Sequence, residues 1–237
     1  MLPQQDPEFV RRTFGSISGR YDFANHLLSG GLDFLWRKTV AGLVATVDPG
    51  TVLDLATGSG DLSLAIRTQC PNARVVGADF CLPMLAEAKK KGVPDLVQAD
   101  ALRLPFRDQS FDAATVAFGL RNMASWPAAL NQLHRVIRPG GLLLILDFSL
   151  PRNAILRSIY RIYLHHVLPR LAGLATGHPE AYRYLGESIE AFPRGERMNA
   201  MIESAGFRCG PPRPLCLGIV ALYSATRTAP NSLSNAA

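Results

Sequence analysis

The middle of the chain alternates short apolar runs with segments whose apolar residues recur at helical spacing. Five runs are rich in aliphatic and β-branched residues and short enough to be buried strands; they cover residues 51–56, 74–79, 96–99, 111–118 and 142–148. Helical spacing connects them over residues 61–68, 83–91 and 127–137. Strands that alternate with helices predict parallel pairing through crossover helices, and therefore a Rossmann-like, doubly wound α/β sheet.

Helical patterns also flank this alternating region. Residues 7–46 and 152–205 have amphipathic character and predict a helical cap over one rim of the sheet. Pro139-Gly140-Gly141 predicts a sharp turn into the fifth strand, and residues 217–225 predict a late antiparallel strand at the sheet edge. We therefore expect one domain over residues 1–225 and a small, polar, frayed tail over 226–237.

Composition and charge narrow the class of protein. With 237 residues, 48% hydrophobic and 19% charged, the chain can bury a full core and does not resemble a disordered protein. Its apolar runs are too short to span a bilayer, and no secretory signal pattern is visible, so we expect a cytoplasmic protein. The four cysteines form no C-x-x-C pair, which predicts reduced thiols and no metal site. A net charge of +6 without a basic run interleaved with aromatics favours a solvated surface over nucleic-acid binding.

The first strand runs directly into a glycine turn and then a helix. In an open parallel sheet, ligands bind outside the carboxyl ends of the strands. Gly58 and Gly60 would let the backbone approach a ligand, and Asp79, at the end of the next strand, can accept hydrogen bonds from ribose hydroxyls. These features alone fit either a dinucleotide or S-adenosylmethionine.

Two residues favour S-adenosylmethionine over a dinucleotide. Ser63 replaces the third glycine of the G-x-G-x-x-G pattern, and Asp61 occupies the expected helix start, where a carboxylate would repel a pyrophosphate. A phosphate-free ligand that carries a sulfonium and an amino group is compatible with acid there, and Asp54 adds a second carboxylate. The alternative is that Asp61 only caps its helix. Asp100, which follows the third strand, fits an acceptor for an adenine amino group and a turn aspartate equally well.

The residues of this glycine turn, with Asp79 and Asp100-Ala101, resemble class I S-adenosylmethionine-dependent methyltransferases. Three further segments are more specific, and they resemble the quinone C-methyltransferases of menaquinone and ubiquinone biosynthesis. These are residues 21–37, with Tyr-Asp, Asn and Trp-Arg; residues 118–122, Phe-Gly-Leu-Arg-Asn; and residues 182–193, with Tyr-Arg-Tyr-Leu, Ser and Phe-Pro. The resemblance runs from about residue 14 to residue 225. Thr57, Asp100 and Ala117 depart from the residues that are common in the family.

The resemblance implies a seven-stranded, mostly parallel sheet and C-methylation of a prenylated quinol by S-adenosylmethionine, with no metal. The acceptor would be demethylmenaquinol or, alternatively, 2-methoxy-6-polyprenyl-1,4-benzoquinol. The expected donor site consists of residues at four strand ends: Asp54, Gly58, Ser59, Gly60, Asp79, Phe80, Asp100, Ala101 and Ala117.

Methylation of a ring carbon needs a phenolate, which pushes charge onto that carbon, and a group that accepts or relays the phenolic proton. We expect Arg121 to stabilise the phenolate or to hold a water that takes the proton, because arginine itself is a poor base. Asn122 would hydrogen-bond a ring oxygen, while Tyr21 and Asp22 would lie in an N-terminal lid, with Asp22 as a relay. The alternative for Arg121 is an ion pair with an acidic neighbour. The expected acceptor site is Asn25, Phe118, Tyr182, Tyr184 and Ser188.

Residues 155–168 predict a basic amphipathic helix. An apolar stripe is formed by Ile155, Ile159, Ile162, Tyr163 and Val167, and basic residues occupy another face. Such a helix can rest on anionic lipid or border a tunnel for an isoprenoid tail, whereas the alternative places its apolar face on the protein core. The expected substrate partner is thus a prenylated hydroquinone. We also expect peripheral contact with the inner face of the cell membrane, and a homodimer formed with a second copy of the chain.

Three other functions can be distinguished from quinol C-methylation. A methyltransferase for another small aromatic acceptor would share the glycine turn but not the specific segments. A nucleic-acid methyltransferase usually has an Asn/Asp-Pro-Pro-aromatic stretch where this chain has residues 119–122. A non-enzymatic module that binds S-adenosylmethionine would keep the donor residues and transfer nothing.

Overall fold

The structure is a computed structural model that describes residues 31–170 and 179–229. Its first half alternates helices and strands: α2 (Leu32–Ala45), β1 (Thr51–Leu55), α3 (Asp61–Gln69), β2 (Arg74–Asp79), α4 (Leu82–Lys90), β3 (Asp95–Gln98), β4 (Phe111–Ala117), η2 (Leu120–Asn122), α5 (Trp126–Val136) and β5 (Ile137–Phe148). The second half contains α6 (Ala154–Ile162), η3 (Tyr163–Val167), α8 (Pro179–Ala191), α9 (Glu196–Ser204), β6 (Phe207–Cys209), β7 (Arg213–Leu215), η4 (Cys216–Gly218) and β8 (Val220–Arg227).

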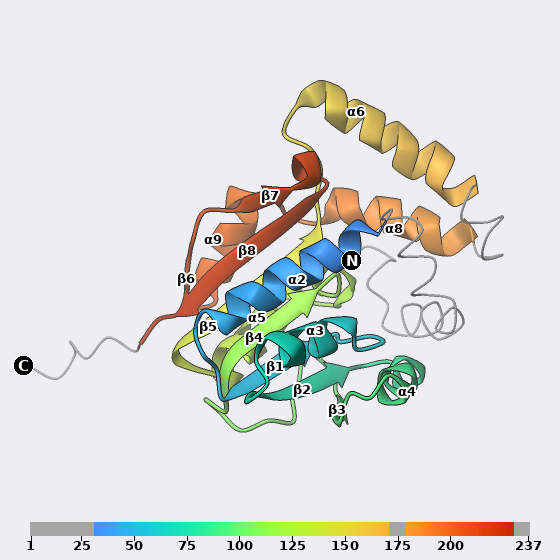
Figure 1. Cartoon of the computed structure of the whole chain (residues 1–237). Coiled ribbons are helices and arrows are strands. Elements are labelled where there is room, and N and C mark those ends of the chain that lie inside the picture. The colour runs from blue at the N-terminus through green and yellow to red at the C-terminus, as the bar shows by residue number, and fades with distance from the viewer. Residues whose placement is uncertain (1–30, 171–178, 230–237) are drawn as a thin grey trace, which may run out of the picture.

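The strands form one mixed sheet in the order β3-β2-β1-β4-β5-β8-β6, with β7 also paired to β8 (Figure 1). β1 to β5 are parallel, and β8 runs antiparallel to β5. Strand order reverses between β1 and β4, which is where an open α/β sheet forms a ligand crevice at its carboxyl edge. The predicted Rossmann-like, doubly wound fold is therefore confirmed.

Alternate side chains of the strands enter two separate cores. Val52, Val75 and Leu144 pack with α2 and α3 on one face, whereas their neighbours Leu53 and Val76 pack with α5 and α9 on the other. This arrangement explains the continuously apolar strand sequences, since both faces of the sheet are covered. A third, smaller cluster joins the chain after β5 to η3 and α8; it consists of Leu150, Leu164, Leu168 and Ile189.

Three sequence expectations about the sheet need correction. The described residues form eight strands rather than seven, because β6 and β7 pair with successive segments of β8 and together fill one edge position. Two prolines, Pro211 and Pro212, lie between them and have no amide hydrogen for a continuous ladder. β8 is therefore internal rather than at the edge, and it extends to Arg227, two residues into the expected tail.

The expected turn at Pro139-Gly140-Gly141 lies inside β5 instead. β5 already pairs at Ile137 with Phe111, and the pairing resumes at Leu142 with Ala113, so the extra residues form an irregular bulge. Gly140 adopts a φ of 77° there, which glycine tolerates at no steric cost. The turn residues were recognised correctly, but they interrupt a strand rather than precede it.

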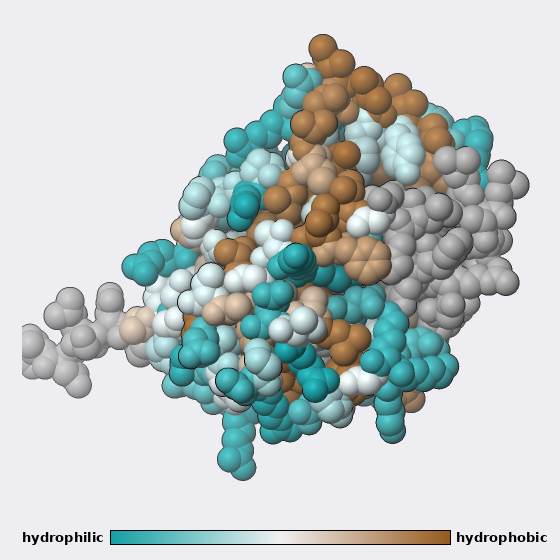
Figure 2. All heavy atoms as spheres, in the orientation of Figure 1, coloured by the Kyte–Doolittle hydropathy of each residue, from teal (hydrophilic) through white to brown (hydrophobic). Residues whose placement is uncertain are grey.

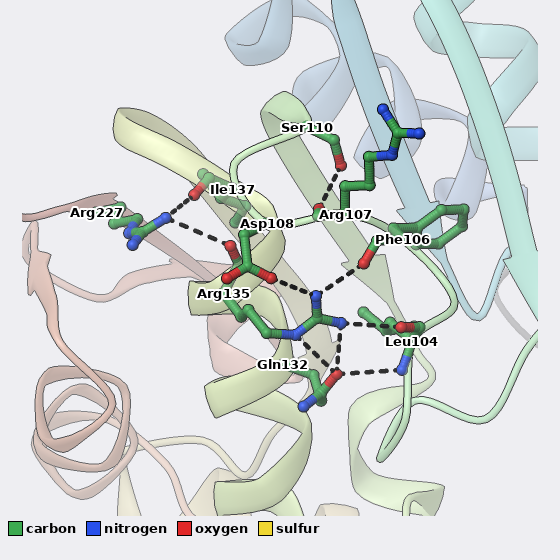
Figure 3. Close-up of polar contacts among 9 residues, drawn as sticks. All are labelled: Leu104, Phe106, Arg107, Asp108, Ser110, Gln132, Arg135, Ile137 and Arg227. Carbon is green, nitrogen blue, oxygen red and sulfur yellow. Dashed lines mark hydrogen bonds and ion pairs between the residues drawn. The ribbon is translucent and has the colours of Figure 1, made fainter.

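The guanidinium of Arg135 at the end of α5 fixes the loop between β3 and β4 (Figure 3). It donates to the carbonyls of Leu104 and Phe106 at 2.8 and 2.7 Å and pairs with Asp108 at 2.7 Å. Arg227 of β8 donates in turn to the carbonyls of Arg135 and Ile137. These contacts therefore anchor the far end of the loop. Its first residues, Asp100 and Ala101, border the carboxyl edge of the sheet.

Candidate active site

Asp79 ties the glycine turn to the end of β2. One carboxylate oxygen accepts from the Gly58 amide and the other from the Cys81 amide, both at 2.8 Å. Burial raises the pKa of Asp79, while these amide hydrogen bonds oppose the shift. Since a carboxylate can accept about four hydrogen bonds, Asp79 retains acceptor capacity toward the cavity that it lines.

Asp54 holds the glycine turn and the adjoining elements through hydrogen bonds. Its side chain is buried, and it accepts hydrogen bonds from the hydroxyls of Thr57, Ser63 and Thr115 at 2.7–2.8 Å. Burial raises the pKa of Asp54, and the three hydroxyls partly offset this effect. Ser63, which replaces the third glycine of the dinucleotide pattern, is thus one of the groups that hold Asp54.

The turn itself needs small residues. Gly60 has a φ of +84°, and a Cβ there would lie 2.6 Å from Val93 Cγ2, so only glycine fits. Ala56 and Phe118, at the ends of β1 and β4, also have positive φ, which is strained for residues with a side chain. Strained backbone therefore clusters at the carboxyl edge of the two central strands.

Asp61 is not an isolated negative charge. Lys91 Nζ lies 2.7 Å from one of its oxygens and Arg37 Nη2 lies 3.8 Å from the other, while the Ser59 hydroxyl donates to it at 3.2 Å. Because these two cations partly neutralise Asp61, it would repel a pyrophosphate less than the sequence suggested. All four residues except Lys91 line the cavity.

The third strand end contributes a turn and an apolar wall. The exposed Asp100 accepts from the Leu102 amide at 2.9 Å, which is an Asx turn. Asp100, Ala101, Leu102 and Phe80 all line the cavity. The turn interpretation of Asp100 is therefore confirmed, and a role toward an adenine stays a prediction.

Arg121 forms a buried ion pair. Its side chain is only 4% exposed, and Nη1 donates to Asp147 Oδ1 and to the Phe118 carbonyl, both at 2.6 Å. The guanidinium also lies over the Phe148 ring, 5.2 Å from its centroid. Burial raises the pKa of Asp147, and Arg121 opposes that shift. The ion pair with an acidic neighbour, which was the alternative for Arg121, is therefore present in the structure. Arg121 also lines the cavity, whereas Asp147 does not.

Asn122 and Tyr184 form a second polar group beside Arg121. The Tyr184 hydroxyl donates to Asn122 Oδ1 at 2.8 Å, across 62 residues of sequence. Burial raises the pKa of Tyr184, so its hydroxyl stays protonated at neutral pH. Phe118 stacks at tilted angles on Trp36 and Phe148, with ring centroids 5.8 and 4.7 Å apart, and this aromatic cluster borders the same cavity.

One cavity of about 730 Å³ brings these groups together. Beyond Arg121 it is walled by apolar residues of the cap, at every fourth position through α6 and η3: Leu156, Tyr160, Leu164 and Leu168. Tyr163 also faces inward rather than joining the outer stripe, and burial raises its pKa and that of Tyr160. The sequence reasoning missed this inward stripe, although its i, i+4 spacing was visible.

Several expected site residues are not placed there. Tyr21, Asp22 and Asn25 lie outside the described residues, and so does the side chain of Tyr182, whose backbone belongs to α8. Ser188 is buried in α8, returns its hydroxyl to the Leu185 carbonyl at 2.9 Å and does not line the cavity. Among the residues that the structure describes, no group of three metal-ligating side chains occurs.

Comparison with known proteins identifies the family. The model of the ubiE/COQ5 methyltransferase family matches residues 3–227. The chain belongs to this family. A demethylmenaquinone methyltransferase of Thermus thermophilus is 48% identical over 199 residues, which cover 82% of this chain and 90% of that relative. The ubiquinone/menaquinone biosynthesis C-methyltransferase UbiE of Syntrophotalea carbinolica is 44% identical over 96% of this chain and 97% of its own length.

Solved structures agree on the fold of this ubiE/COQ5 family member. A SAM-dependent methyltransferase of Thermotoga maritima superposes with a TM-score of 0.65 at 15% identity, covering 92% of this chain and 99% of the other. This similarity confirms the predicted class I fold. The family match and the curated relatives show that the protein is an S-adenosylmethionine-dependent methyltransferase. No described helix has both the length and the apolar character needed to cross a bilayer.

Proposed function

We propose that this protein methylates a ring carbon of a prenylated quinol, demethylmenaquinol, in menaquinone biosynthesis. The observation that supports it most directly is the composition of the cavity of about 730 Å³. Its walls combine the glycine turn and Asp79, a central group of Arg121, Asn122 and Tyr184, and a long apolar wall from the cap. These three parts of the wall match, in order, a nucleoside donor, a polar ring and an isoprenoid tail.

The residues at the first three strand ends fit S-adenosylmethionine. Asp79 has acceptor capacity for ribose hydroxyls, Phe80 and Leu102 offer apolar faces, and the Gly58 turn leaves room for close backbone approach. Bound there, the donor supplies an electrophilic methyl group. Asp54 would act through the turn, since its oxygens are occupied by three hydroxyls.

Arg121 and Asn122 would act on the ring oxygens. Arg121 would place positive charge beside the developing phenolate, and Asp147 would position it. Asn122, oriented by the Tyr184 hydroxyl, would donate through its amide to a ring oxygen. The phenolic proton would leave through a water that Arg121 holds, because a guanidinium is a poor base. After the methyl group has moved from sulfur to the ring carbon, the hydrogen on that carbon would leave as a proton, which restores the aromatic ring. Tyr21 and Asp22 stay predicted members of this group.

Peripheral membrane contact is part of this proposal. A prenylated acceptor partitions into the bilayer, and the outer residues of α6 and η3 are apolar and exposed, among them Ile155, Ile159 and Val167. A cytoplasmic location and a homodimer stay predictions; light scattering of the purified chain would check the latter.

The decisive experiment offers isotope-labelled donor with reduced quinones of both ring types. We expect labelled methyl on a ring carbon of the demethylnaphthoquinol, located by tandem mass spectrometry. The oxidised quinone is the matched control, since it has no hydroxyl to ionise and should stay unlabelled. Label on oxygen, or donor binding without transfer to any quinol, would refute the proposal. Transfer to the benzoquinol would establish the second candidate, which we consider because the name of the Syntrophotalea relative includes ubiquinone as well as menaquinone biosynthesis.

A further inference from the structure

A second cavity, of about 280 Å³, lies outside the reaction site. Its walls come from the start of α6, the loop before α9, η4 and β8. Three arginines line it, Arg152, Arg157 and Arg194, against one acidic residue, Glu196. At this size it is at the small end of ligand sites, which suits a compact anionic group.

The positive charge of this cavity is not balanced by nearby acids. Within the described part of the chain, no carboxylate lies within 4.0 Å of the guanidinium nitrogens of these three arginines. The nearby Arg161 differs, because it pairs with Glu190 at 2.8 Å. Burial and then the charges of Arg157, Arg161 and Arg197 lower the pKa of Arg194, while Glu190, which has the smallest effect, opposes the shift.

The arginine cavity adjoins an exposed apolar surface. Ile155, Ile159 and Ile162 are 71, 59 and 57% exposed on one side of α6, and Leu217 of η4 is 77% exposed. Figure 2 shows this surface in brown at the top of the view, where Figure 1 places α6. Ile155 and Ile162 are not among the residues that line the reaction cavity, which the inner stripe of the same helix lines.

The geometry of α6 would place the exposed apolar surface and the arginine cavity at different depths in a bilayer. Arg157 is two positions from both Ile155 and Ile159, which is about 200° around the helix. A helix whose apolar face enters a bilayer by about 5–10 Å leaves its opposite face at the level of the phosphates. Ile159 and Leu217 also line the reaction cavity, so the apolar surface is continuous with the route for a lipid-soluble acceptor.

We propose that the cavity lined by Arg152, Arg157 and Arg194 binds the phosphate of an anionic phospholipid while Ile155, Ile159, Ile162 and Leu217 enter the bilayer. The inference deepens the proposed function, on which it rests for a membrane-borne acceptor. It names the lipid class and the residues that recognise it. The protein would then take its acceptor laterally from the membrane.

Vesicle flotation of the full chain tests the site in the absence of donor and quinol. Wild-type protein should float with vesicles of 70% phosphatidylcholine and 30% phosphatidylglycerol, and much less with phosphatidylcholine alone. Arg152→Gln with Arg194→Gln should reduce the partition coefficient by about 10- to 30-fold at low salt. The matched control is Arg107→Gln with Arg208→Gln, which removes equal charge from exposed sites elsewhere. Ile155→Ser with Ile162→Ser should reduce binding to both vesicle types.

If Arg152→Gln with Arg194→Gln and Arg107→Gln with Arg208→Gln lowered the partition coefficient equally, the phosphate site would be refuted. Diffuse charge attraction would then explain the binding. If Ile155→Ser with Ile162→Ser converted a dimer to a monomer and left flotation intact, the apolar surface would be a subunit interface and the proposal would be wrong. Melting curves must show that each variant is folded. Failure of the methylation assay in detergent would refute the proposed function without changing any of these flotation results.

Discussion

Three carboxyl groups at the carboxyl edge, two of them buried and one half-buried, differ in what surrounds them. Burial raises the pKa of Asp54, Asp79 and Asp147 alike. Neutral hydroxyls hold Asp54, backbone amides hold Asp79, and a guanidinium holds Asp147. Asp79 is only half-buried and lines the cavity, whereas Asp54 and Asp147 are buried, so the three residues should respond differently to the same substitution.

Replacing Asp79 by Asn should weaken donor binding. The amide nitrogen of Asn would face the Gly58 or Cys81 amide, which loses one hydrogen bond and an acceptor for the ribose. Hydrogen bonds to a charged group contribute about 1.5–3 kcal/mol, so the Kd for S-adenosylmethionine should rise at least about 10-fold. Isothermal titration measures it. Asp95→Asn on the neighbouring strand, an exposed position paired with Arg74, is the control and should bind normally.

Arg121 must be tested together with Asp147. Arg121→Ala alone would leave Asp147 buried and unpaired, at a cost of about 3–5 kcal/mol, so lost turnover could reflect unfolding. Arg121→Met with Asp147→Leu replaces the ion pair by apolar residues and should keep most of the stability. Turnover of the double variant should fall about 100-fold or more, while the Kd for the donor changes less than threefold. Near-normal turnover in a folded double variant would remove Arg121 from the mechanism.

Elements meet closely where β1 and β4 end. A Cβ on Gly119 would lie 2.3 Å from Ala56 Cβ, although the φ of Gly119, −109°, suits any residue. The close approach of the two strand ends, rather than backbone conformation, therefore requires glycine at this position. The two residues with positive φ, Ala56 and Phe118, lie at this contact and next to it in the chain.

Gly119→Ala should separate the two strand ends and disturb donor and acceptor positions together. We expect a loss of about 1–3 kcal/mol in the free energy of unfolding and weaker donor binding. Gly42→Ala in α2 is the matched control: nothing lies within 4 Å of its Cβ, and a helix gains up to about 1 kcal/mol from the exchange. Urea denaturation should therefore move in opposite directions for the two variants. A neutral Gly119→Ala would mean that the strand ends are loosely packed.

Local patterns predicted the elements but not their long-range partners. The strand at residues 74–79 and the helix start at Asp61 follow from period and turn chemistry, which are local properties. The pairing of Arg121 with Asp147 and of Asn122 with Tyr184 depends on sheet order and on the cap, and no local pattern encodes either. The start of β5 was missed because a bulge and a turn use the same proline and glycine residues.

At the scale of the whole molecule, the site lies where three packed units meet. The two faces of the sheet and the smaller cluster around Leu164 and Ile189 all border it. Asp54 is buried at this meeting point, with hydroxyl partners on β4, on α3 and in the turn. Its ionisation therefore couples the stability of the sheet to pH.

The contribution of Asp54 to stability should decrease as pH rises. Burial raises its folded-state pKa above the ordinary value of 3.8, so the folded protein binds this proton more tightly than the unfolded chain. The contribution is fully present below pH 3.8 and is lost as pH rises through the folded-state pKa. Asn cannot titrate, so the stability advantage of wild type over Asp54→Asn should be larger at pH 4.5 than at pH 7.5.

Urea denaturation of both proteins at several pH values measures this advantage, provided that their m-values agree. Asp95→Asn supplies a control of opposite sign, because Arg74 holds the pKa of Asp95 below its ordinary value. There the advantage of wild type should grow as pH rises from the lowered folded-state pKa to the ordinary value of 3.8, and it should be fully present above that value. An advantage of Asp54 that also grew with pH would show that the three hydroxyls outweigh burial and keep the carboxyl ionised. The site would then hold a permanent negative charge beneath the donor, which would stabilise a sulfonium directly.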